Sequence, residues 1–176
     1  NLKPGDFVKV RVTRADARVI EPRWSCEWLA PSYRVGETKY AFALQVLARL
    51  FGGTETSRLW RAMVIDAKLA LSVSAGYSPA SLGLTSFGIG VHPAPTRTVA
   101  EIEAAVSLEM KKLVDGGVTA AEVERAQNQL LAGAIYAQDS LASGPRLYGT
   151  MLSTGGTIAD IDAWPERIAA VTPVLS

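Results

Sequence analysis

Two neighbouring stretches rich in Val, Ser, Thr, Ile and Phe, residues 69–77 and 82–91, most constrain what this chain can fold into. Such composition favours β-strands, and the Ser-Pro-Ala sequence between them favours a turn. The two stretches therefore predict an antiparallel pair of strands. A further strand is expected at residues 24–30, where alternate side chains share one face: Trp24, Cys26 and Trp28.

Segments with the apolar spacing of amphipathic helices surround these strands. Two helices are expected between the first and second strands, at residues 40–51 and 57–67. Later helices are expected at residues 98–115, 119–138 and 146–153, and from residue 158 onward. This order predicts an α+β domain in which a small, largely antiparallel sheet packs against several helices on one of its faces.

Local signals indicate where several of the helices begin and end. The glycine pairs Gly52-Gly53 and Gly116-Gly117 are expected to stop helices through left-handed C-caps. Thr119, followed three residues later by Glu122, forms a capping-box sequence that would start the helix at 119–138. The helix at 57–67 is expected to be capped by Thr54 or Thr56.

Composition excludes several classes of protein. The 18 Lys and Arg residues nearly balance the 17 Asp and Glu residues and are interspersed with them, so we expect neither a nucleic-acid partner nor an anionic membrane partner. No apolar run approaches the roughly 18 residues that would cross a bilayer. Cys26 is the single cysteine, which excludes an internal disulfide framework and any metal site built from several cysteines.

The 176 residues divide into a short connector and one domain. Residues 1–22 are polar, Arg-rich and interrupted by proline and glycine, which indicates a connector from an upstream domain. A strand within residues 8–20 is only weakly indicated. Residues 23–176 are expected to form the folded domain. Because the sequence does not begin with Met, we expect it to be a piece of a longer protein.

Few side chains could support catalysis. His92 is the only histidine, and the chain contains no His-x-x-Glu-His sequence or its inverse, so we expect no catalytic residue and no metal in this chain. The glycines between Gly83 and Gly90 fall in an expected strand and lack the order of a phosphate-binding loop.

Several motifs together resemble one protein family. The run from Gly52-Gly53-Thr54 to Ser57-Arg58-Leu59-Trp60 resembles the GGG-x-x-SRL turn of pitrilysin and insulinase-like zinc metallopeptidases, the group that includes mitochondrial processing peptidase. Residues 68–76 resemble the strand that follows this turn, residues 118–130 resemble a T-x-x-E-L helix, and residues 154–172 resemble a near-terminal segment. Members contain paired homologous α+β domains, and this chain resembles the second, inactive C-terminal domain.

The resemblance also implies which residues would face substrate. Active members commonly contribute an Arg and a Tyr from this domain, and Val64 and Leu71 stand at those two positions here. Neither side chain can stabilise an oxyanion, an interaction worth about 3 to 4 kcal/mol. Val64, Leu71 and Ser72 are therefore expected to line a substrate chamber as a wall without catalysing. Arg58 and Arg61 are out of register and are interpreted as helix-surface or capping residues.

By resemblance, the chain is expected to be a non-catalytic C-terminal domain that supplies the chamber wall and the domain or dimer contacts for peptide processing. Zinc would be held by an upstream homologous catalytic domain or by a partner subunit of the same family. The implied location is a bacterial periplasm or cell envelope. A second hypothesis is a structural assembly module of an inactive homologue. A third is an independent enzyme that uses Asp66, Lys68 or His92, which lack partners at catalytic spacing.

Overall fold

The structure is a computed structural model that describes residues 10–14, 22–138 and 143–173. Within this part of the chain, the elements follow the expected order of one strand, two helical segments, two strands and then helices. The strands are β1 (Trp24–Ala30), β2 (Ala70–Tyr77) and β3 (Thr85–Pro93). The helices are η1 (Thr38–Tyr40), α1 (Ala41–Gly52), α2 (Arg58–Trp60), η2 (Arg61–Asp66), α3 (Val99–Gly116), α4 (Ala120–Gln138), α5 (Ser143–Ser153), α6 (Ile158–Asp162) and α7 (Trp164–Ala169).

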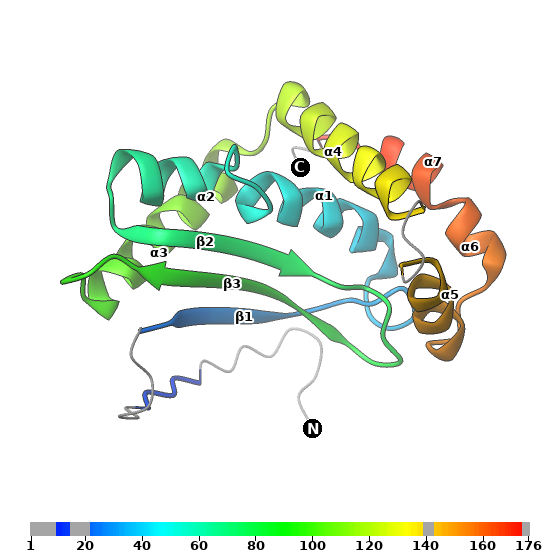
Figure 1. Ribbon diagram of the computed structural model, residues 1–176, viewed down its shortest axis with the longest axis horizontal. Coiled ribbons are helices and arrows are strands. Elements are labelled where there is room, and N and C mark those ends of the chain that lie inside the picture. The colour runs from blue at the N-terminus through cyan, green and yellow to red at the C-terminus, as the bar shows by residue number, and fades with distance from the viewer. Residues whose placement is uncertain (1–9, 15–21, 139–142, 174–176) are drawn as a thin grey trace.

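The three described strands form one antiparallel sheet in the order β1-β3-β2. Trp28, Phe87 and Tyr77 lie opposite one another in register across it, and they share a face because side chains alternate along a strand. Helices α1, α2 and α3 cover this face, and α3 passes behind β2 and β3 in Figure 1. The fold is therefore α+β, with a small antiparallel sheet covered by helices on one face, as predicted.

Two clusters of buried side chains hold the layers together. The larger lies between the covered face of the sheet and the helices, and its most buried members include Phe51, Leu59 and Ile89. The smaller lies between α1, α4 and α7, where Val46 and Ile168 are buried. Because α1 contributes to both clusters, it is the central helix of the described domain.

Glycine at the end of α1 permits close packing rather than a left-handed turn. Gly53 has a right-handed φ of −81°, so the C-cap conformation predicted for this pair is wrong. A Cβ on Gly52 would lie 2.6 Å from the backbone nitrogen of Ala75 in β2. Helix α1 thus approaches β2 more closely than any side chain would allow. After α3, Gly117 has a positive φ of 64° but a ψ of −158°, so this helix also ends at the predicted glycine pair without the left-handed helical cap that was expected.

Reciprocal side-chain caps begin three of the described helices. The box predicted for α4 is confirmed, because the amide and hydroxyl of Thr119 donate to Oε2 of Glu122 at 2.9 and 2.8 Å. In return, the amide of Glu122 donates to the Thr119 hydroxyl at 3.3 Å. The boxes of α3 and α6 pair Thr98 with Glu101 and Thr157 with Asp160.

The cap expected for the second helix is wrong. The hydroxyls of Thr54 and Thr56 lie 3.0 Å from each other instead of capping the helix. Ser57 occupies the N-cap position of α2, and its side chain makes no cap hydrogen bond. The turn before α2 is closed by a backbone bond, in which the Ser57 amide donates to the Thr54 carbonyl at 3.1 Å.

Some predictions concern residues outside the described part of the chain. Most of the connector expected at residues 1–22 falls on residues 1–9 and 15–21, and the break expected near residues 140–144 falls mainly on residues 139–142. These stay predictions. Within residues 10–14, Arg11 pairs with Glu103 of α3 at 2.8 Å. None of the described helices combines the length and the apolar character needed to cross a membrane.

Candidate functional site

The three positions expected to line a chamber lie on two consecutive elements. Val64 belongs to η2, whereas Leu71 and Ser72 belong to β2. A regular helix was expected over 57–67, but η2 is a π-helix, in which the amide of Ala67 donates to the carbonyl of Ala62 five residues earlier, at 3.0 Å. π-Helical turns are rare in proteins overall, and those that do occur are often found at functional sites.

The junction between η2 and β2 is fixed by backbone hydrogen bonds. Lys68 reverses the chain with a positive φ of 51°. The amide of Leu69 donates to the carbonyl of Met63 at 2.8 Å, and the carbonyl of Leu69 accepts from the amide of Ala94 at 2.9 Å. The end of η2 is thereby tied to the start of β2 and to the chain just beyond β3.

The residues predicted to line the chamber differ in how far they are exposed. Val64 is partly buried and packs against the larger core cluster. Leu71 is 56% exposed, and it lies at an irregularity of the ladder between Ala70 and Ser72. An extra residue of this kind leaves the regular pleat and re-aims its side chain. The structure therefore places Leu71 on the surface and turns Val64 largely inward.

Ile65 of η2 is exposed as well, although sequence reasoning did not single it out. It is 58% exposed, whereas Met63, two residues earlier, is buried in the core. In an α-helix, with about 3.6 residues per turn, a residue two positions after Met63 already lies on the side opposite the buried stripe, so Ile65 is exposed without any contribution from the wider π-helical turn of η2. No pattern in the sequence marks this wider turn. We call Val64, Ile65, Leu71 and Ser72 the η2–β2 wall.

The η2–β2 wall is poor in reactive groups. Val64 and Leu71, at the Arg and Tyr positions of the resemblance, carry no hydrogen-bond donor. Ser72 lies opposite His92 in the ladder, and Asp66 and Lys68 are exposed. Among the residues that the structure describes, no group of three or more His, Cys, Asp or Glu side chains could hold a metal ion. The wall therefore offers shape and apolar contact rather than acid, base or metal chemistry.

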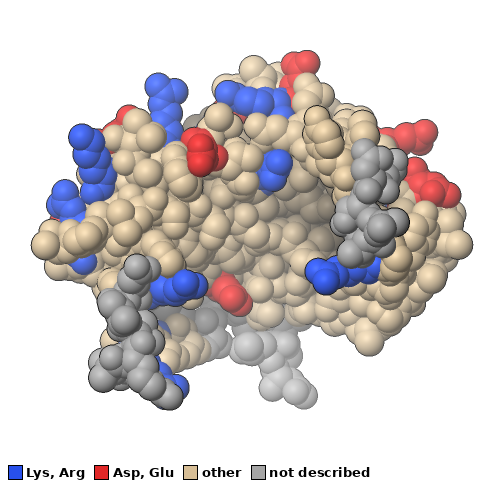
Figure 2. Space-filling view, viewed as in Figure 1, with Lys and Arg blue, Asp and Glu red and all other residues tan. Residues whose placement is uncertain are grey.

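The sheet face opposite the helices carries mainly small side chains near this wall. Ser74 lies opposite Gly90 and Gly76 lies opposite Gly88 in the ladder, and Ser72 continues the same row. Few charged side chains lie over the central strands on this face, which is turned toward the viewer in Figure 2. Because glycine and serine project little, an extended backbone could approach this face closely.

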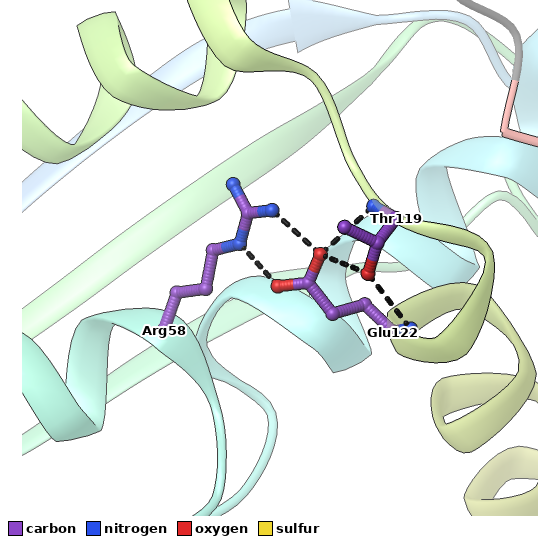
Figure 3. A network of polar contacts seen from close by, with 3 residues as sticks. All are labelled: Arg58, Thr119 and Glu122. Carbon is purple, nitrogen blue, oxygen red and sulfur yellow. Dashed lines mark hydrogen bonds and ion pairs between the residues drawn. The ribbon is translucent and has the colours of Figure 1, made fainter.

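A polar network supports the segment that carries the η2–β2 wall (Figure 3). Nε and Nη2 of Arg58 donate to the two carboxylate oxygens of Glu122, each at 2.6 Å. Glu122 is the residue that also completes the cap with Thr119. The pair joins α2 to α4 across 64 residues of sequence. Arg58 was interpreted as a surface or capping residue, and its partner on α4 was not foreseen.

The network holds Glu122 as a carboxylate. Its side chain is 18% exposed and that of Arg58 is 26% exposed, so both are largely shielded from water. The hydrogen bond from Arg58, followed by those from Thr119, lowers the pKa of Glu122 to about 2, against the opposing effect of burial. Bidentate pairing of this kind fixes geometry as well as charge. The network therefore orients α2 and η2 against α4.

Comparison with known families identifies a related group. The model of the family described as the peptidase M16 inactive domain matches residues 3–130, which is most of the chain. A search of curated proteins found no match to this sequence.

Solved structures share the fold at low sequence identity. A protease from Helicobacter pylori aligns with a TM-score of 0.75 and 18% identity over 85% of this chain and 35% of its own. The inactive peptidase domain of a candidate zinc protease from Bordetella parapertussis aligns with a TM-score of 0.74 and 16% identity, over 93% of this chain and 83% of its own. A candidate zinc protease from Bordetella pertussis Tohama I gives 0.72 and 15%, over 88% and 82%. The chain thus spans about a third of the Helicobacter protein and most of the two Bordetella chains.

Proposed function

Because this chain belongs to the peptidase M16 inactive-domain family, we propose that it is the non-catalytic C-terminal domain of a zinc metallopeptidase and forms part of the wall of its substrate chamber. The observation that carries this proposal is the η2–β2 wall, which is exposed at Ile65 and Leu71 yet lacks donors at Val64 and Leu71. A surface of this kind can contact a peptide without taking part in bond cleavage.

Zinc belongs elsewhere in this proposal. The described residues do not fit the metal, because no three of their His, Cys, Asp or Glu side chains converge. A catalytic zinc site needs three protein ligands and an open position. We therefore assign zinc to a homologous domain upstream in the same polypeptide, or to a partner subunit of the same family.

The peptide would lie extended along the wall and the neighbouring sheet face. The backbone of β2, an edge strand of the described sheet, could pair with the main chain of the peptide and so tolerate many sequences, and the small side chains of Ser72, Ser74 and Gly76 leave room beside it. Contacts with the zinc-bearing domain, or with a second subunit, would close the chamber. Location in a bacterial periplasm or cell envelope stays a prediction.

A second candidate is a structural assembly module with no proteolytic role. The exposed apolar side chains of Ile65 and Leu71 favour it, because such groups also suit a permanent protein contact. In that case these residues would be covered by another protein rather than by substrate.

The experiment compares three samples: this chain, the zinc-bearing domain or subunit, and the two together. Each is incubated with an unfolded, internally quenched fluorogenic peptide, with and without zinc, and association is followed by gel filtration. We expect the chain to be inactive and the combination to cleave faster than the zinc-bearing part. Association without any gain in cleavage would support the assembly module. Zinc-dependent cleavage by the isolated chain would refute both.

A double variant sharpens this comparison. Val64→Arg combined with Leu71→Tyr restores the two side-chain types that active relatives carry. We expect the isolated double variant to remain inactive, because donors cannot replace the missing metal ligands. Measurable turnover by the isolated variant would reveal a metal site that the proposal denies.

A further inference from the structure

A concave site lies at the far end of β2 from the η2–β2 wall. It is a pocket of 380 Å³ between the β1–α1 loop, the turn joining β2 to β3, and the segment from α5 to α7. Residues that line it include Arg34, Phe42, Ser81, Met151, Asp160 and Arg167. Because a strand advances about 3.3 Å per residue, the length of β2 separates the pocket from Leu71 by roughly 20 Å. Its volume suits a small ligand group.

Cationic side chains outnumber acidic ones on the lining of this pocket. The lining contains three cationic side chains, those of Arg34, Lys39 and Arg167, but only one carboxylate, that of Asp160. That carboxylate is already engaged, because Oδ2 accepts from the amide and hydroxyl of Thr157 at 3.0 and 2.8 Å. Its Oδ1 accepts from Arg167 at 3.2 Å. The remaining positive charge belongs to Arg34 and Lys39.

Arg34 is held by its backbone while its guanidinium has no ion-pair partner among the described residues. The hydroxyl of the buried Ser32 accepts from the amides of Arg34 and Val35, at 3.2 and 3.0 Å, which fixes the loop. The guanidinium packs against Gly155, where an added Cβ would lie 3.6 Å from the Arg34 Cζ. Gly155 has a φ of 83°, a conformation that favours glycine.

Lys39 contributes a charge held only by an exposed ion pair. Its ammonium lies 3.3 Å from the carboxylate of Glu37, and the two side chains are 67% and 73% exposed. Exposed pairs of this kind contribute little free energy and exchange partners easily. Lys39 is therefore available to a ligand anion at small cost.

The rest of the lining offers an apolar and rigid support. Phe42 stacks near Tyr33, with ring centroids 5.3 Å apart, and the guanidinium of Arg167 lies 5.6 Å from the centre of the Phe42 ring. The Tyr33 hydroxyl accepts from Nε2 of Gln45 at 3.0 Å. Burial raises the pKa of Tyr33, so this hydroxyl stays neutral and keeps its proton.

We propose that this pocket binds a carboxylate carried on a short aliphatic stem, with Arg34 as its main donor and Arg167 and Lys39 as supporting charges. A guanidinium presents a planar fork that matches both oxygens of a carboxylate. The methylene groups of the stem would contact Phe42 and Met151. Such a group can come from the acidic side chain of a peptide or from a free dicarboxylic acid.

Isothermal titration calorimetry at low ionic strength tests this assignment. The probes are a short blocked peptide containing Glu, the same peptide with Gln, and glutarate. We expect the Glu peptide to bind at least about tenfold more tightly than the Gln peptide, because only the former carries the charge. Tighter binding of the peptide than of glutarate identifies a peptide as the source, and equal binding identifies a free acid.

Two variants and a matched control connect this binding to the pocket. Arg34→Gln should weaken binding of the Glu peptide about tenfold, and Lys39→Gln should weaken it less, since its charge is shared with Glu37. Arg125→Gln removes an exposed arginine of α4 outside the pocket and should leave binding unchanged. Circular dichroism checks that all variants are folded. Equal binding of the Glu and Gln peptides, no binding, or binding unaffected by both pocket variants would overturn the proposal, whatever the outcome of the cleavage assay.

Discussion

Glu122 combines a helix cap and an ion pair in one carboxylate. Its oxygens accept from Thr119 and from both donors of Arg58. We expect Glu122→Gln to lower the free energy of unfolding by about 2 kcal/mol, because charge-assisted hydrogen bonds of a shielded group are lost. Urea unfolding at pH 7 measures this change.

Glu124 provides the matched control for that substitution. It lies on the same helix and is exposed. Glu124→Gln should alter the free energy of unfolding by no more than about 0.5 kcal/mol. Equal effects of the two substitutions would mean that the network contributes no more than ordinary surface charge.

The same network predicts a pH dependence of stability. The pKa of Glu122 is lowered to about 2 from its ordinary 4.5, so its folded state binds the proton more weakly than its unfolded state. This contribution is fully present above pH 4.5 and is lost as the pH falls toward 2. The stability difference between the natural chain and Glu122→Gln should therefore shrink over that window in unfolding curves. A difference that stays constant down to pH 2.5 would contradict the assigned pKa.

The local spacing of residues predicted the cap formed by Thr119 and Glu122 but did not predict the ion pair between Glu122 and Arg58. The box of Thr119 and Glu122 spans three residues, so the sequence alone predicts it. Arg58 lies 64 residues from Glu122, and their contact depends on how α2 packs against α4. A pattern of neighbouring residues carries no information on that packing, which is why Arg58 was interpreted as a surface or capping residue.

At the scale of elements, the packing of η2 against the core predicts different effects for substitutions at two apolar residues, Met63 and Ile65. Met63 is 1% exposed, whereas Ile65 is 58% exposed. Met63→Ala should lower the free energy of unfolding by about 3 kcal/mol through the lost burial and the cavity left behind. Ile65→Ala should change it by less than about 0.5 kcal/mol. A comparable loss for Ile65→Ala in chemical denaturation would mean that the segment buries Ile65 as well.

The close approach of α1 to β2 makes a second prediction at this scale. Gly52→Ala would place a Cβ against the backbone of Ala75 and should cost about 2 to 3 kcal/mol. Gly133 in α4 has open space around its would-be Cβ, so Gly133→Ala should stabilise the chain by about 0.5 to 1 kcal/mol. Thermal unfolding of both variants measures these opposite signs. Stabilisation by both substitutions would mean that α1 can shift away from the sheet.

The extent of most elements was predictable, but the conformation within some of them was not. Strand β1 has the predicted bounds, and the ends of α3 and α4 differ from prediction by no more than one residue. Alternation and helical spacing are local and strong in those segments. The close packing of Gly52 depends on the approach of β2, which arises only in the folded chain, and no sequence pattern marks the hydrogen bond from Ala67 to Ala62 in η2.

At the scale of the whole molecule, the spacing of apolar residues predicted a sheet covered by helices on one face. The resemblance to the peptidase family predicted which residues would line the substrate chamber. The positions of Val64, Leu71 and Ser72 followed from aligned motifs, but their exposure did not. Val64 packs against the core together with the buried Leu59 and Met63, whereas Ile65, two positions after Met63, is exposed. The charged pocket at the other end of β2 also had no signal in the sequence, since its cations come from two distant segments, the stretch between β1 and α1 and helix α7.

The central claim is that the η2–β2 wall faces a peptide in the assembled peptidase. Photocrosslinking tests it most directly, with p-benzoylphenylalanine placed at Leu71 and, as a control, at the exposed Val114 of α3. The labelled chain is combined with the zinc-bearing domain or subunit and irradiated with a tagged, unfolded peptide. We expect a crosslink to the peptide from position 71 and none from position 114. A crosslink from position 71 to another part of the assembly and never to the peptide would contradict it.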